Sequence, residues 1–511
     1  MELLTRLEKY ANERANTVAF KNAYTDQEIT YSALWSYSDK IAKKITEILP
    51  SDKSPVVVYG HKSPLMLAIF TACVKSGHPY CPVDISMPTD RLKDIVVASE
   101  TSLLIAMEDT EVTCSNKLVA ADIETIVNTD LSDGGFSADD YVSGPDIYYI
   151  IFTSGSTGKP KGVMITADDL DNYLFWMESL MKRDVGLDHI TFLNQAPFSF
   201  DLSVMDTYTS LFVGGSIWCM EKRLQEDMGL MHQKLSDSGL NVWVSTPSFM
   251  NVCLLNKEFN ADMMKDMKAF YFCGEVLTNK TARQLKERFP EASVINTYGP
   301  TESTVAVTEV VVTDEMAASE HPLSIGYDKP GTTIFIMDEN YSYPAKPEGE
   351  KGEIVIAGNT VAAGYLNQPE LTADKFFKLS TEAGTMWAYK TGDEGYKKDG
   401  LLYYCGRMDF QLKLNGYRIE LGDIESNILE MSDVTYCVVL PIEKRGEVKG
   451  LAAFVTLDHP VEDEFEYSQS VRKYLQEKLP HYMIPKKCIV LSEMPMTGNG
   501  KADRRALKEM I

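Results

Sequence analysis

The sequence predicts an α/β protein that ends in a smaller α+β module. Three observations indicate this. The chain has 511 residues, which exceeds the usual size of one hydrophobic core. Its first third alternates short apolar runs with amphipathic stretches, a rhythm typical of βαβ units and a mostly parallel sheet. Roughly the last hundred residues follow a different pattern, with two long apolar strands before one amphipathic helix.

The βαβ rhythm is clearest near the N-terminus. Apolar runs at 55–59, 80–83 and 102–106 predict buried strands. A helical pattern begins at 65–70, and a second one occupies 91–100. Helices between consecutive strands favour parallel pairing, because a parallel crossover needs a connection of a dozen or more residues.

The same alternation resumes between about 190 and 320, where runs at 241–244 and 269–272 predict further strands. Residues 320–405 change character, since they are rich in Gly and Pro and contain only short apolar runs. We expect a small β-rich subdomain there.

The C-terminal part predicts two strands, at 434–440 and 451–457, followed by a helix. Val471, Leu475 and Leu479 share one face of that helix, and Pro480 should end it. No period of 20 to 50 residues is present, which excludes repeat architectures.

The chain is acidic, with a formal net charge of −24. This charge argues against general binding to nucleic acid or to anionic membranes, both of which need basic surfaces. The nine cysteines are scattered and never spaced Cys-x-x-Cys, so they indicate neither a disulfide framework nor a zinc site. The N-terminus lacks an apolar signal core, and no uncharged run approaches membrane-span length. We expect a cytoplasmic protein without membrane insertion.

A loop rich in hydroxyls, glycines and lysines, residues 153–162, directly follows the apolar run 148–152. Glycines let the backbone approach an anion, hydroxyls and amides donate to it, and lysines neutralise it. A Walker loop does not fit, because only two residues separate Gly155 from Gly158 and Pro160 follows Lys159. The loop therefore indicates a polyphosphate site of another kind, and a flexible surface linker is the alternative.

The second motif, Asn-Thr-Tyr-Gly-Pro-Thr-Glu, occupies residues 296–302. Its aromatic ring offers a stacking face for a base, and the Thr-Glu pair suits Mg²⁺ on phosphate oxygens. Taken alone, it is equally typical of a plain turn at the end of a strand.

Further motifs follow at 389–393, 406–413, 415–420 and 497–501. They contain an aspartate that suits ribose hydroxyls and a lysine on a Gly-rich loop. Each, taken singly, is typical of solvated surface.

Together, in this order, the motifs resemble the ANL adenylating superfamily, which includes acyl-CoA synthetases, luciferases and the adenylation domains of peptide synthetases. The resemblance covers nearly the whole chain. It implies a large adenylation domain over residues 1–407 and a small mobile α+β domain over 408–511 that carries the catalytic lysine, with a hinge at Asp409. It also implies the chemistry: a carboxylate attacks the α-phosphate of ATP, pyrophosphate leaves, and a thiol captures the acyl-adenylate.

The resemblance implies a role for each motif residue. Lys501 would be the catalytic residue, bridging the substrate carboxylate and the α-phosphate, where a cation offsets the charge that builds as two anions meet. Thr301 and Glu302 would hold Mg²⁺. The implied ATP-binding residues are Thr153, Ser154, Gly155, Ser156, Thr157, Gly158, Lys159, Asn296, Thr297, Tyr298, Gly299, Pro300, Thr301, Asp393, Tyr404, Gly406, Arg407 and Lys501. Lys161 would complete the phosphate cradle.

Asp201 indicates which acid is activated. The segment 198–201 resembles that of amino-acid-activating members, whose aspartate pairs with the α-ammonium of the substrate. A fatty-acid or aryl-acid enzyme gains nothing from burying a carboxylate there. The alternative is a structural aspartate that caps a helix.

Cys273, Gly274 and Val305 lie in segments that resemble those of freestanding members which activate D-alanine. In those members the cysteine and the valine shape a pocket that suits a small side chain. Cys273 is otherwise typical of an ordinary buried apolar residue. Preference for the D enantiomer is implied by the resemblance alone.

The chain ends ten residues after Lys501 without a carrier motif, so we expect a freestanding monomer whose acceptor thiol belongs to a separate carrier protein or to CoA. The resemblance implies a phosphopantetheinylated carrier protein as the acceptor, in the D-alanylation of lipoteichoic acid. Carrier proteins are generally acidic, and the candidate docking residues are Lys444, Arg445, Lys449, Lys486 and Lys487. Three alternatives stay open: a ligase for another small amino acid, a carboxylic acid–CoA ligase, and an ATP-binding protein without catalysis.

Overall fold

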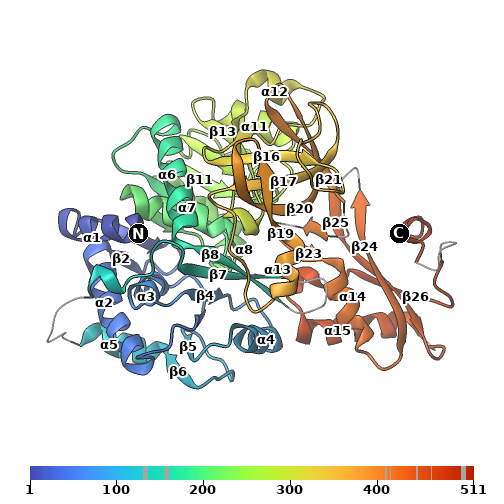
Figure 1. Cartoon of the computed structure of the whole chain (residues 1–511), viewed down its shortest axis with the longest axis horizontal. Coiled ribbons are helices and arrows are strands. Elements are labelled where there is room, and N and C mark those ends of the chain that lie inside the picture. The colour runs from blue at the N-terminus through green and yellow to red at the C-terminus, as the bar shows by residue number, and fades with distance from the viewer. Residues whose placement is uncertain are drawn as a thin grey trace. The chain divides into compact units, whose positions relative to one another are not determined.

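The structure is a computed structural model, and it describes every residue except 130–135, 155–159, 409–410, 415, 445–446, 462 and 497–501. The chain forms two compact units. Unit 1 consists of Met1–Asp84, Ser99–Ile151 and Gly162–Met408, and unit 2 consists of Ile85–Ala98, Phe152–Lys161 and Asp409–Ile511. Figure 1 shows the chain coloured by residue number. The mixed α/β class is confirmed, whereas the domain boundary between residues 407 and 408 stays a prediction.

The largest sheet of unit 1 has nine strands in its described residues. Six neighbouring strands are parallel, and antiparallel strands flank them at both edges. In sheet order the strands are β15 (Tyr327–Asp328), β14 (Thr308–Val311), β13 (Ser293–Tyr298), β12 (Ala269–Phe272), β11 (Val242–Ser245), β9 (Thr191–Asn194), β10 (Ser216–Cys219), β1 (Val18–Asn22) and β2 (Glu28–Thr30). The strands predicted at 241–244 and 269–272 are therefore confirmed as β11 and β12.

A second sheet has seven described strands. They are, in order, β18 (Gly364–Tyr365), β8 (Lys161–Thr166), β7 (Ile147–Thr153), β4 (Tyr80–Val83), β3 (Val56–Tyr59), β5 (Leu103–Ala106) and β6 (Asn116–Val119). Pairing is parallel from β7 through β4, β3 and β5 to β6, as the alternating pattern predicted.

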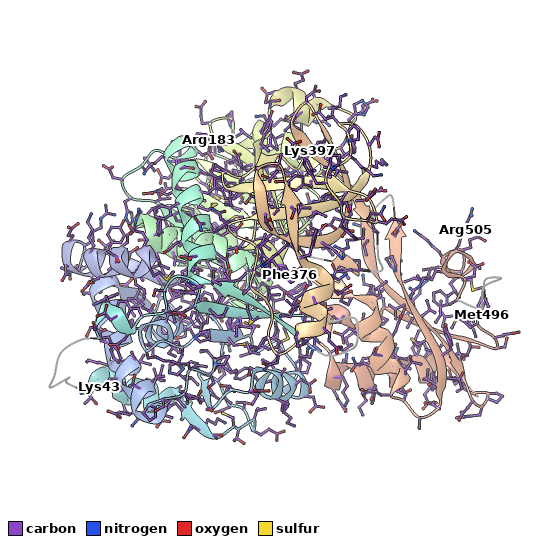
Figure 2. All side chains as sticks on the ribbon, viewed as in Figure 1. Lys43, Arg183, Phe376, Lys397, Met496 and Arg505 are labelled. Carbon is purple, nitrogen blue, oxygen red and sulfur yellow. The ribbon has the colours of Figure 1, made fainter. Side chains whose placement is uncertain are left out.

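The predicted β-rich segment forms a five-stranded antiparallel sheet. It contains β16 (Thr332–Met337), β17 (Gly352–Gly358), β19 (Phe376–Thr381), β20 (Gly384–Lys398) and β21 (Leu401–Arg407). Two side chains labelled in Figure 2 stabilise this region: Phe376 stacks on Trp387 with ring centroids 5.9 Å apart, and Lys397 pairs with Asp328 at 2.7 Å.

Helices of unit 1 pack with the two large sheets into two hydrophobic clusters. The helices are α1 (Glu2–Glu13), α2 (Tyr31–Ile48), α3 (Pro64–Lys75), α5 (Ala120–Asn128), α6 (Ala167–Asp184), α7 (Leu202–Val213), α8 (Lys222–Glu226), α9 (Met228–Ser236), α10 (Pro247–Cys253), α11 (Asn279–Arg288), α12 (Asp314–Ala318) and α13 (Pro369–Lys375). Helix α7 is buried on all sides, because every residue from Leu202 to Phe212 is buried.

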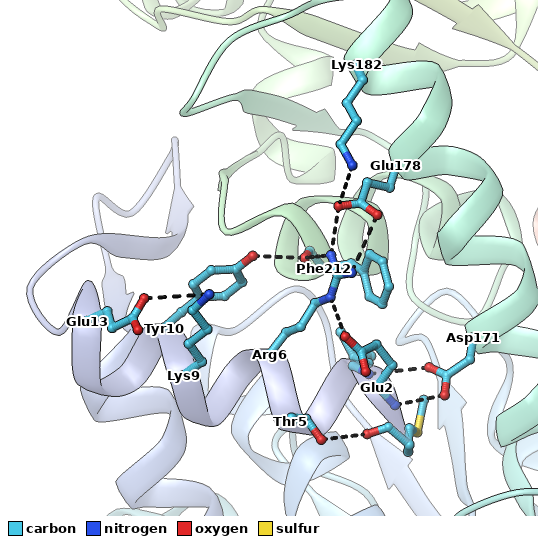
Figure 3. A network of polar contacts seen from close by, with 12 residues as sticks. Glu2, Thr5, Arg6, Lys9, Tyr10, Glu13, Asp171, Glu178, Lys182 and Phe212 are labelled. Atoms are coloured by element: carbon cyan, nitrogen blue, oxygen red, sulfur yellow. Dashed lines mark hydrogen bonds and ion pairs between the residues drawn. The ribbon is translucent and has the colours of Figure 1, made fainter.

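The N-terminal helix α1 is fixed to α6 and α7 by polar contacts (Figure 3). Asp171 of α6 accepts the backbone N–H groups of Glu2 and Leu3, which satisfies donors at the helix start. Arg6 pairs with Glu178 at 2.9 Å and lies 3.8 Å from the centre of the Phe212 ring. This network holds the chain start against the buried helix α7.

Unit 2 contains a two-stranded and a three-stranded sheet in its described residues. The strands are β22 (Gln411–Leu414), β23 (Tyr417–Glu420), β24 (Val434–Lys444), β25 (Glu447–Leu457) and β26 (Lys487–Leu491), and the helices are α4 (Thr89–Ser99, most of which lies in this unit), α14 (Leu421–Leu429), α15 (Glu464–Lys478) and α16 (Arg504–Lys508). Val471 and Leu475 of α15 are buried, and the helix ends before Pro480 as predicted.

Helix α7 carries polar side chains inside the core. Asp206 is fully buried, and its Oδ1 accepts from Asn194 Nδ2 at 2.7 Å and from Thr207 Oγ1 at 2.9 Å. Loss of solvation raises the pKa of Asp206 to about 8, although the Asn194 bond and the charge of Lys62 act in the opposite direction. The carboxyl group is therefore protonated in the folded protein at neutral pH.

Asp206→Asn should remove a pH dependence of stability. In the unfolded chain an aspartate titrates near its ordinary pKa, so folding takes up a proton between that pKa and about 8, and stability falls as pH rises through this window. The variant lacks this uptake, so its stability relative to wild type should rise by up to about 1.4 kcal/mol per pH unit. Urea unfolding at several pH values between 5 and 8 measures this slope, and a difference that does not change with pH contradicts the assignment.

Candidate functional site

A carboxylate in the five-stranded sheet joins two other side chains of the predicted nucleotide motifs. Asp393 of β20 is buried, and its Oδ2 accepts from the Tyr298 hydroxyl at 2.5 Å. Its Oδ1 accepts from Arg407 of β21 at 2.9 Å. Burial, followed by the negative charge of Asp393, raises the pKa of Tyr298 well above its usual value. The phenol therefore stays protonated and acts as the donor.

Strand pairing explains why these residues meet. Asp393 and Arg407 are direct partners in the antiparallel pair of β20 and β21. A register shift follows between Glu394 and Gly395, so Tyr404 lies opposite Gly395. The Tyr404 ring lies 6.3 Å from that of Tyr298, at an angle of 38°. Gly406, between Tyr404 and Arg407, has a φ of +127°, a conformation open to glycine and few other residues.

The residues before Tyr298 anchor β13 to its surroundings. Asn296 Nδ2 donates to the carbonyl of Ser324 at 2.8 Å, and Thr297 Oγ1 donates to that of Phe272, also at 2.8 Å. Both side chains are buried. The Thr297 bond holds the end of β13 next to β12, whose last residue precedes Cys273, and the Asn296 bond ties β13 to the segment that contains Ser324.

Two carboxylates, those of Asp201 and Glu302, are hydrogen-bonded at the short helical turn Thr301–Ser303. Thr301 Oγ1 donates to Asp201 Oδ2 at 2.7 Å. Glu302 is fully buried, and its Oε1 accepts from the Tyr365 hydroxyl at 2.8 Å. One carboxylate beside a hydroxyl fits Mg²⁺, which proteins commonly hold with one or two carboxylates together with substrate phosphates. In the described part of the chain no three His, Cys, Asp or Glu side chains are grouped to hold a metal ion by themselves.

Asp201 stands at the N-cap position of α7, yet its side chain makes no capping bond to that helix. The carboxylate instead accepts from Thr301, on the other side of the turn. A helix cap therefore does not account for this residue. Its negative charge also raises the pKa values of Tyr149 and Tyr173, after the larger effect of burial, which locates both phenols near the carboxylate.

Cys273 and Val305, which the resemblance implies shape the substrate pocket, contact each other, and the pocket itself stays a prediction. Both are buried, and the Cys273 thiol donates to the carbonyl of Val305 at 3.6 Å. Gly274 follows with a φ of +91°, so the chain turns sharply after the cysteine. Cys273 also influences the pKa of Tyr173, as Asp201 does, so the thiol and the carboxylate lie near the same phenol.

The backbone at Thr304 and Val305 is strained. Both residues are β-branched, and their φ values are +59° and +69°. Such residues rarely adopt the left-handed region, at a cost of roughly 1–3 kcal/mol each. The N–H of Ala306 donates to the carbonyl of Thr304 at 2.8 Å, and Thr304 Oγ1 donates to that of Thr360 at 2.9 Å. Strain of this kind gathers at functional sites.

Gly299 allows this strained turn to lie against the motif. A Cβ at Gly299 would lie 2.6 Å from the Ala306 Cα and 2.7 Å from the Val305 carbonyl oxygen. Only glycine leaves room for the two backbone segments to approach so closely. The motif at 296–302 therefore needs its glycine for contact with the segment that carries Val305.

The described ends of the Gly-rich loop both contact β23 within unit 2. Ser154 Oγ donates to the carbonyl of Arg418 at 3.0 Å and accepts from the N–H of Glu420 at 3.2 Å. Lys161 pairs with Glu420 at 3.4 Å. Thr153 ends β7, and its buried Oγ1 has no hydrogen-bond partner among the described residues.

Several predicted residues lie outside the described part of the chain. They are Gly155, Ser156, Thr157, Gly158, Lys159, the hinge Asp409, Arg445 and the catalytic Lys501. Their roles stay predictions. Pro300 is described, and it precedes the turn Thr301–Ser303 at its N-cap position.

Comparison with protein families now identifies the fold and the motifs together. A model described as "AMP-binding enzyme" matches residues 7–366, and one described as "AMP-binding enzyme C-terminal domain" matches 423–501. The chain belongs to the AMP-binding enzyme family.

Curated relatives of this AMP-binding enzyme are similar over their full length. It is 43% identical to the D-alanine–D-alanyl carrier protein ligase of Bacillus licheniformis, with 100% of both chains covered. It is 44% identical to the enzyme of that name from Bacillus anthracis, with 99% of both covered. Among solved structures, a nonribosomal peptide synthetase protein with adenylation and PCP domains aligns with a TM-score of 0.82 at 24% identity, covering 100% of this chain and 84% of the other. That last likeness shows the fold alone.

Sequence reasoning missed three phenols of this AMP-binding enzyme. The Tyr365 hydroxyl donates to Glu302, and none of the motifs found in the sequence includes this tyrosine. Tyr149 and Tyr173 are fully buried, and their hydroxyls have no partner among the described residues. Both lie in apolar patterns that predict core packing, so no sequence signal distinguishes them. In the described residues, no helix has the length and apolar character needed to span a membrane.

Gly299→Ala should destabilise this AMP-binding enzyme, because the added Cβ meets backbone atoms that cannot rotate away. We expect the free energy of unfolding to fall by about 1–3 kcal/mol. Gly229→Ala is the matched control, since a Cβ there meets nothing closer than 3.6 Å and the residue lies in α9. Thermal unfolding of both variants tests this. Equal midpoints would contradict the close approach of the two segments.

Proposed function

We propose that this AMP-forming ligase activates D-alanine as D-alanyl-AMP and transfers the D-alanyl group to the phosphopantetheine thiol of a separate carrier protein. The observation that carries the proposal is the carboxylate of Asp201, which is held by Thr301 instead of capping α7. Full-length identity of 43–44% to D-alanine–D-alanyl carrier protein ligases supports the same substrate.

The site would recognise the amino acid by the charge of its ammonium group and by the small size of its side chain. Asp201 would pair with the α-ammonium of the substrate, which repays the desolvation of a partly buried carboxylate. The Cys273 thiol and the Val305 side chain would border the α-methyl group. The strain at Val305 supports this role, because it persists only where the surroundings hold the residue in place.

The nucleotide side would use the residues around Asp393. The ribose hydroxyls would donate to Asp393, whose oxygens each have a second lone pair beyond the bonds from Tyr298 and Arg407. Adenine would lie against the Tyr298 ring, close to Asn296. Glu302 and Thr301 would hold Mg²⁺, which would neutralise phosphate charge.

In the first step, a carboxylate oxygen of D-alanine would attack the α-phosphorus of ATP, and pyrophosphate would leave. Lys501 would donate to both the carboxylate and the α-phosphate, which reduces the repulsion between the two anions. In the second step, the carrier thiolate would attack the carbonyl carbon of D-alanyl-AMP, and AMP would leave with the bonding electrons. Movement at Asp409 would separate the two steps.

The wider setting is also a proposal. The carrier-bound D-alanine would supply D-alanylation of lipoteichoic acid. The enzyme would act as a monomer in the cytoplasm, where ATP is available.

The substrate is tested by ATP–pyrophosphate exchange with D-alanine, L-alanine, glycine, D-serine and acetate. We expect the highest kcat/KM with D-alanine and no exchange for Lys501→Ala. Asp201→Asn should lower kcat/KM for D-alanine by roughly 10- to 100-fold, because it removes a charge-assisted bond while the amide still accepts from Thr301.

The matched control for this experiment is Asp237→Asn, an exposed aspartate in unit 1 that should leave every parameter unchanged. The KM for ATP should stay the same in Asp201→Asn. A maximum with acetate, or an unchanged Asp201→Asn enzyme, would contradict the proposed role of this carboxylate.

The carrier would dock on a basic part of unit 2. Lys444, Lys449, Lys486 and Lys487 are exposed, and Lys486 Nζ donates to the carbonyl of Lys449. The pairing of Ala452 with Lys487 places these residues on the three-stranded sheet. An acidic carrier would be attracted there despite the net charge of −24.

Lys449→Glu combined with Lys486→Glu should raise the KM for the carrier several-fold and leave pyrophosphate exchange intact. The control replaces Lys257 of unit 1, an exposed lysine, by glutamate. Steady-state transfer to the carrier measures the effect. Loss of exchange as well as transfer would mean that the lysines serve the fold and not the carrier.

A further inference from the structure

A buried lysine outside all the motifs binds only backbone carbonyls. Lys62 precedes α3 by two residues, and 1% of its surface is exposed. Its ammonium donates to the carbonyls of Asn194 at 3.1 Å, Gln195 at 2.7 Å and Met220 at 3.1 Å. In the described part of the chain, no carboxylate lies within ion-pair distance of this ammonium.

Nearby negative groups and hydrogen-bond acceptors stabilise the positive charge of Lys62. Burial lowers the pKa of Lys62, and nearby negative groups, among them the carboxylates of Asp84 and Glu221, act in the opposite direction. A buried ammonium with three carbonyl acceptors has each of its protons hydrogen-bonded. This arrangement satisfies the donor fully and fixes three carbonyl groups at once.

The backbone of Lys62 is itself in an unfavourable conformation, with a φ of +41°. Asn22 Nδ2 donates to its carbonyl at 3.4 Å. A lysine gains nothing locally from the left-handed region, so the surroundings must hold it there. The conformation directs the side chain at the ends of β9 and β10, where the three carbonyls lie.

Two of those carbonyls begin the segment that leads to Asp201. Asn194 ends β9, Gln195 follows, and α7 begins directly after Asp201. The side chain of Asn194 donates to Asp206, in the second turn of α7. Within the segment, the N–H of Phe200 donates to the carbonyl of Pro197 at 3.0 Å. The connection between β9 and α7 is therefore fixed at its start by Lys62 and bonded to the helix that follows.

We infer that Lys62 is a positioning residue for the amino-acid site: by holding the carbonyls of Asn194 and Gln195 it sets the place of the Asp201 carboxylate. The inference rests on the proposed function of Asp201 as the acceptor of the substrate ammonium. Lys62 itself touches no reacting atom. It acts through the backbone of the segment, at the end opposite to Thr301.

Another lysine provides a matched comparison. Lys75 ends the same helix, α3, and is also fully buried. Its ammonium pairs with Asp39 at 2.8 Å and lies 3.0 Å from the centre of the Trp35 ring. Its hydrogen bonds in the described structure go to Asp39 and to the Trp35 carbonyl, not to the segment 194–201. Removing either charge should destabilise the fold, whereas only Lys62 should affect the amino-acid site.

Lys62→Met tests the inference by separating two Michaelis constants in pyrophosphate exchange. We expect the KM for the amino acid to rise roughly 10- to 100-fold, because small displacements of a binding group have effects of this size, and the KM for ATP to stay within about 2-fold. Lys75→Met should lower the melting temperature with neither KM changed. Lys62→Arg should recover part of the amino-acid affinity, since its N–H groups also donate to carbonyls.

Gln225→Leu is a second variant that tests the same inference if Lys62→Met does not fold. Gln225 Nε2 donates to the same Met220 carbonyl at 3.2 Å, and its Oε1 accepts from Gln195 at 3.0 Å. This partly buried residue supports the same carbonyl group from outside, and we expect its loss to raise the amino-acid KM several-fold. If Lys62→Met folds, equal changes in the KM for the amino acid and the KM for ATP overturn the inference. If Lys62→Met does not fold, an unchanged amino-acid KM in Gln225→Leu overturns it.

The wild-type enzyme separates this inference from the proposed function. Its preference among acids tests D-alanine as the substrate, and each variant is then compared with wild type on the preferred amino acid. If wild type prefers a different amino acid, the D-alanine proposal is refuted. The role of Lys62 is then tested by comparing how far each variant changes the KM for that amino acid and the KM for ATP. A preferred acid without an amine overturns both.

Discussion

The close approach of two backbone segments at Gly299 is the constraint on which the candidate site depends. One segment carries the motif that includes Tyr298, Thr301 and Glu302, and the other carries Val305. Since no side chain separates them, the residues proposed for the nucleotide and those proposed for the small acid share one turn. Val305, with a φ of +69°, lies in the nine-residue connection 299–307 in which the chain reverses direction between the antiparallel strands β13 and β14. Packing density, and not local preference, decides the conformation there.

Hydrogen bonding then gives each acidic residue of the site a distinct environment. Asp393 accepts from a phenol and a guanidinium, Glu302 from a phenol, and Asp201 from a hydroxyl. All three are held by donors on other elements, so their orientations are set before any ligand arrives. Such preorganisation reduces the ordering that binding would otherwise require.

Much of the architecture could be predicted from periodicity. The strands β3, β4, β5, β11 and β12 are short apolar runs bounded by polar residues, and the structure confirms each one. The resemblance pointed to Cys273 and Val305 as pocket residues, and the structure places the thiol against the Val305 carbonyl, although their role in a pocket stays a prediction. Long-range polar contacts could not be predicted, because the partners of a buried group are distant in the chain: Asn194 lies 132 residues from Lys62, and Tyr365 lies 63 from Glu302. Backbone strain at Val305 and Lys62 leaves no trace in residue pattern, since neither residue type favours it.

The burial of the cysteines has a consequence for the chemistry of an enzyme that handles thioesters. The chain has nine free thiols, and an activated acyl group transfers readily from one thiolate to another. Burial raises the pKa of Cys219, Cys253 and Cys488 to about 12, and it raises those of Cys73, Cys81 and Cys437 further from neutrality as well. These groups are thus protonated and enclosed, and they are poor nucleophiles. Burial in the core therefore protects these six thiols from acylation by an acyl-adenylate formed on this scaffold.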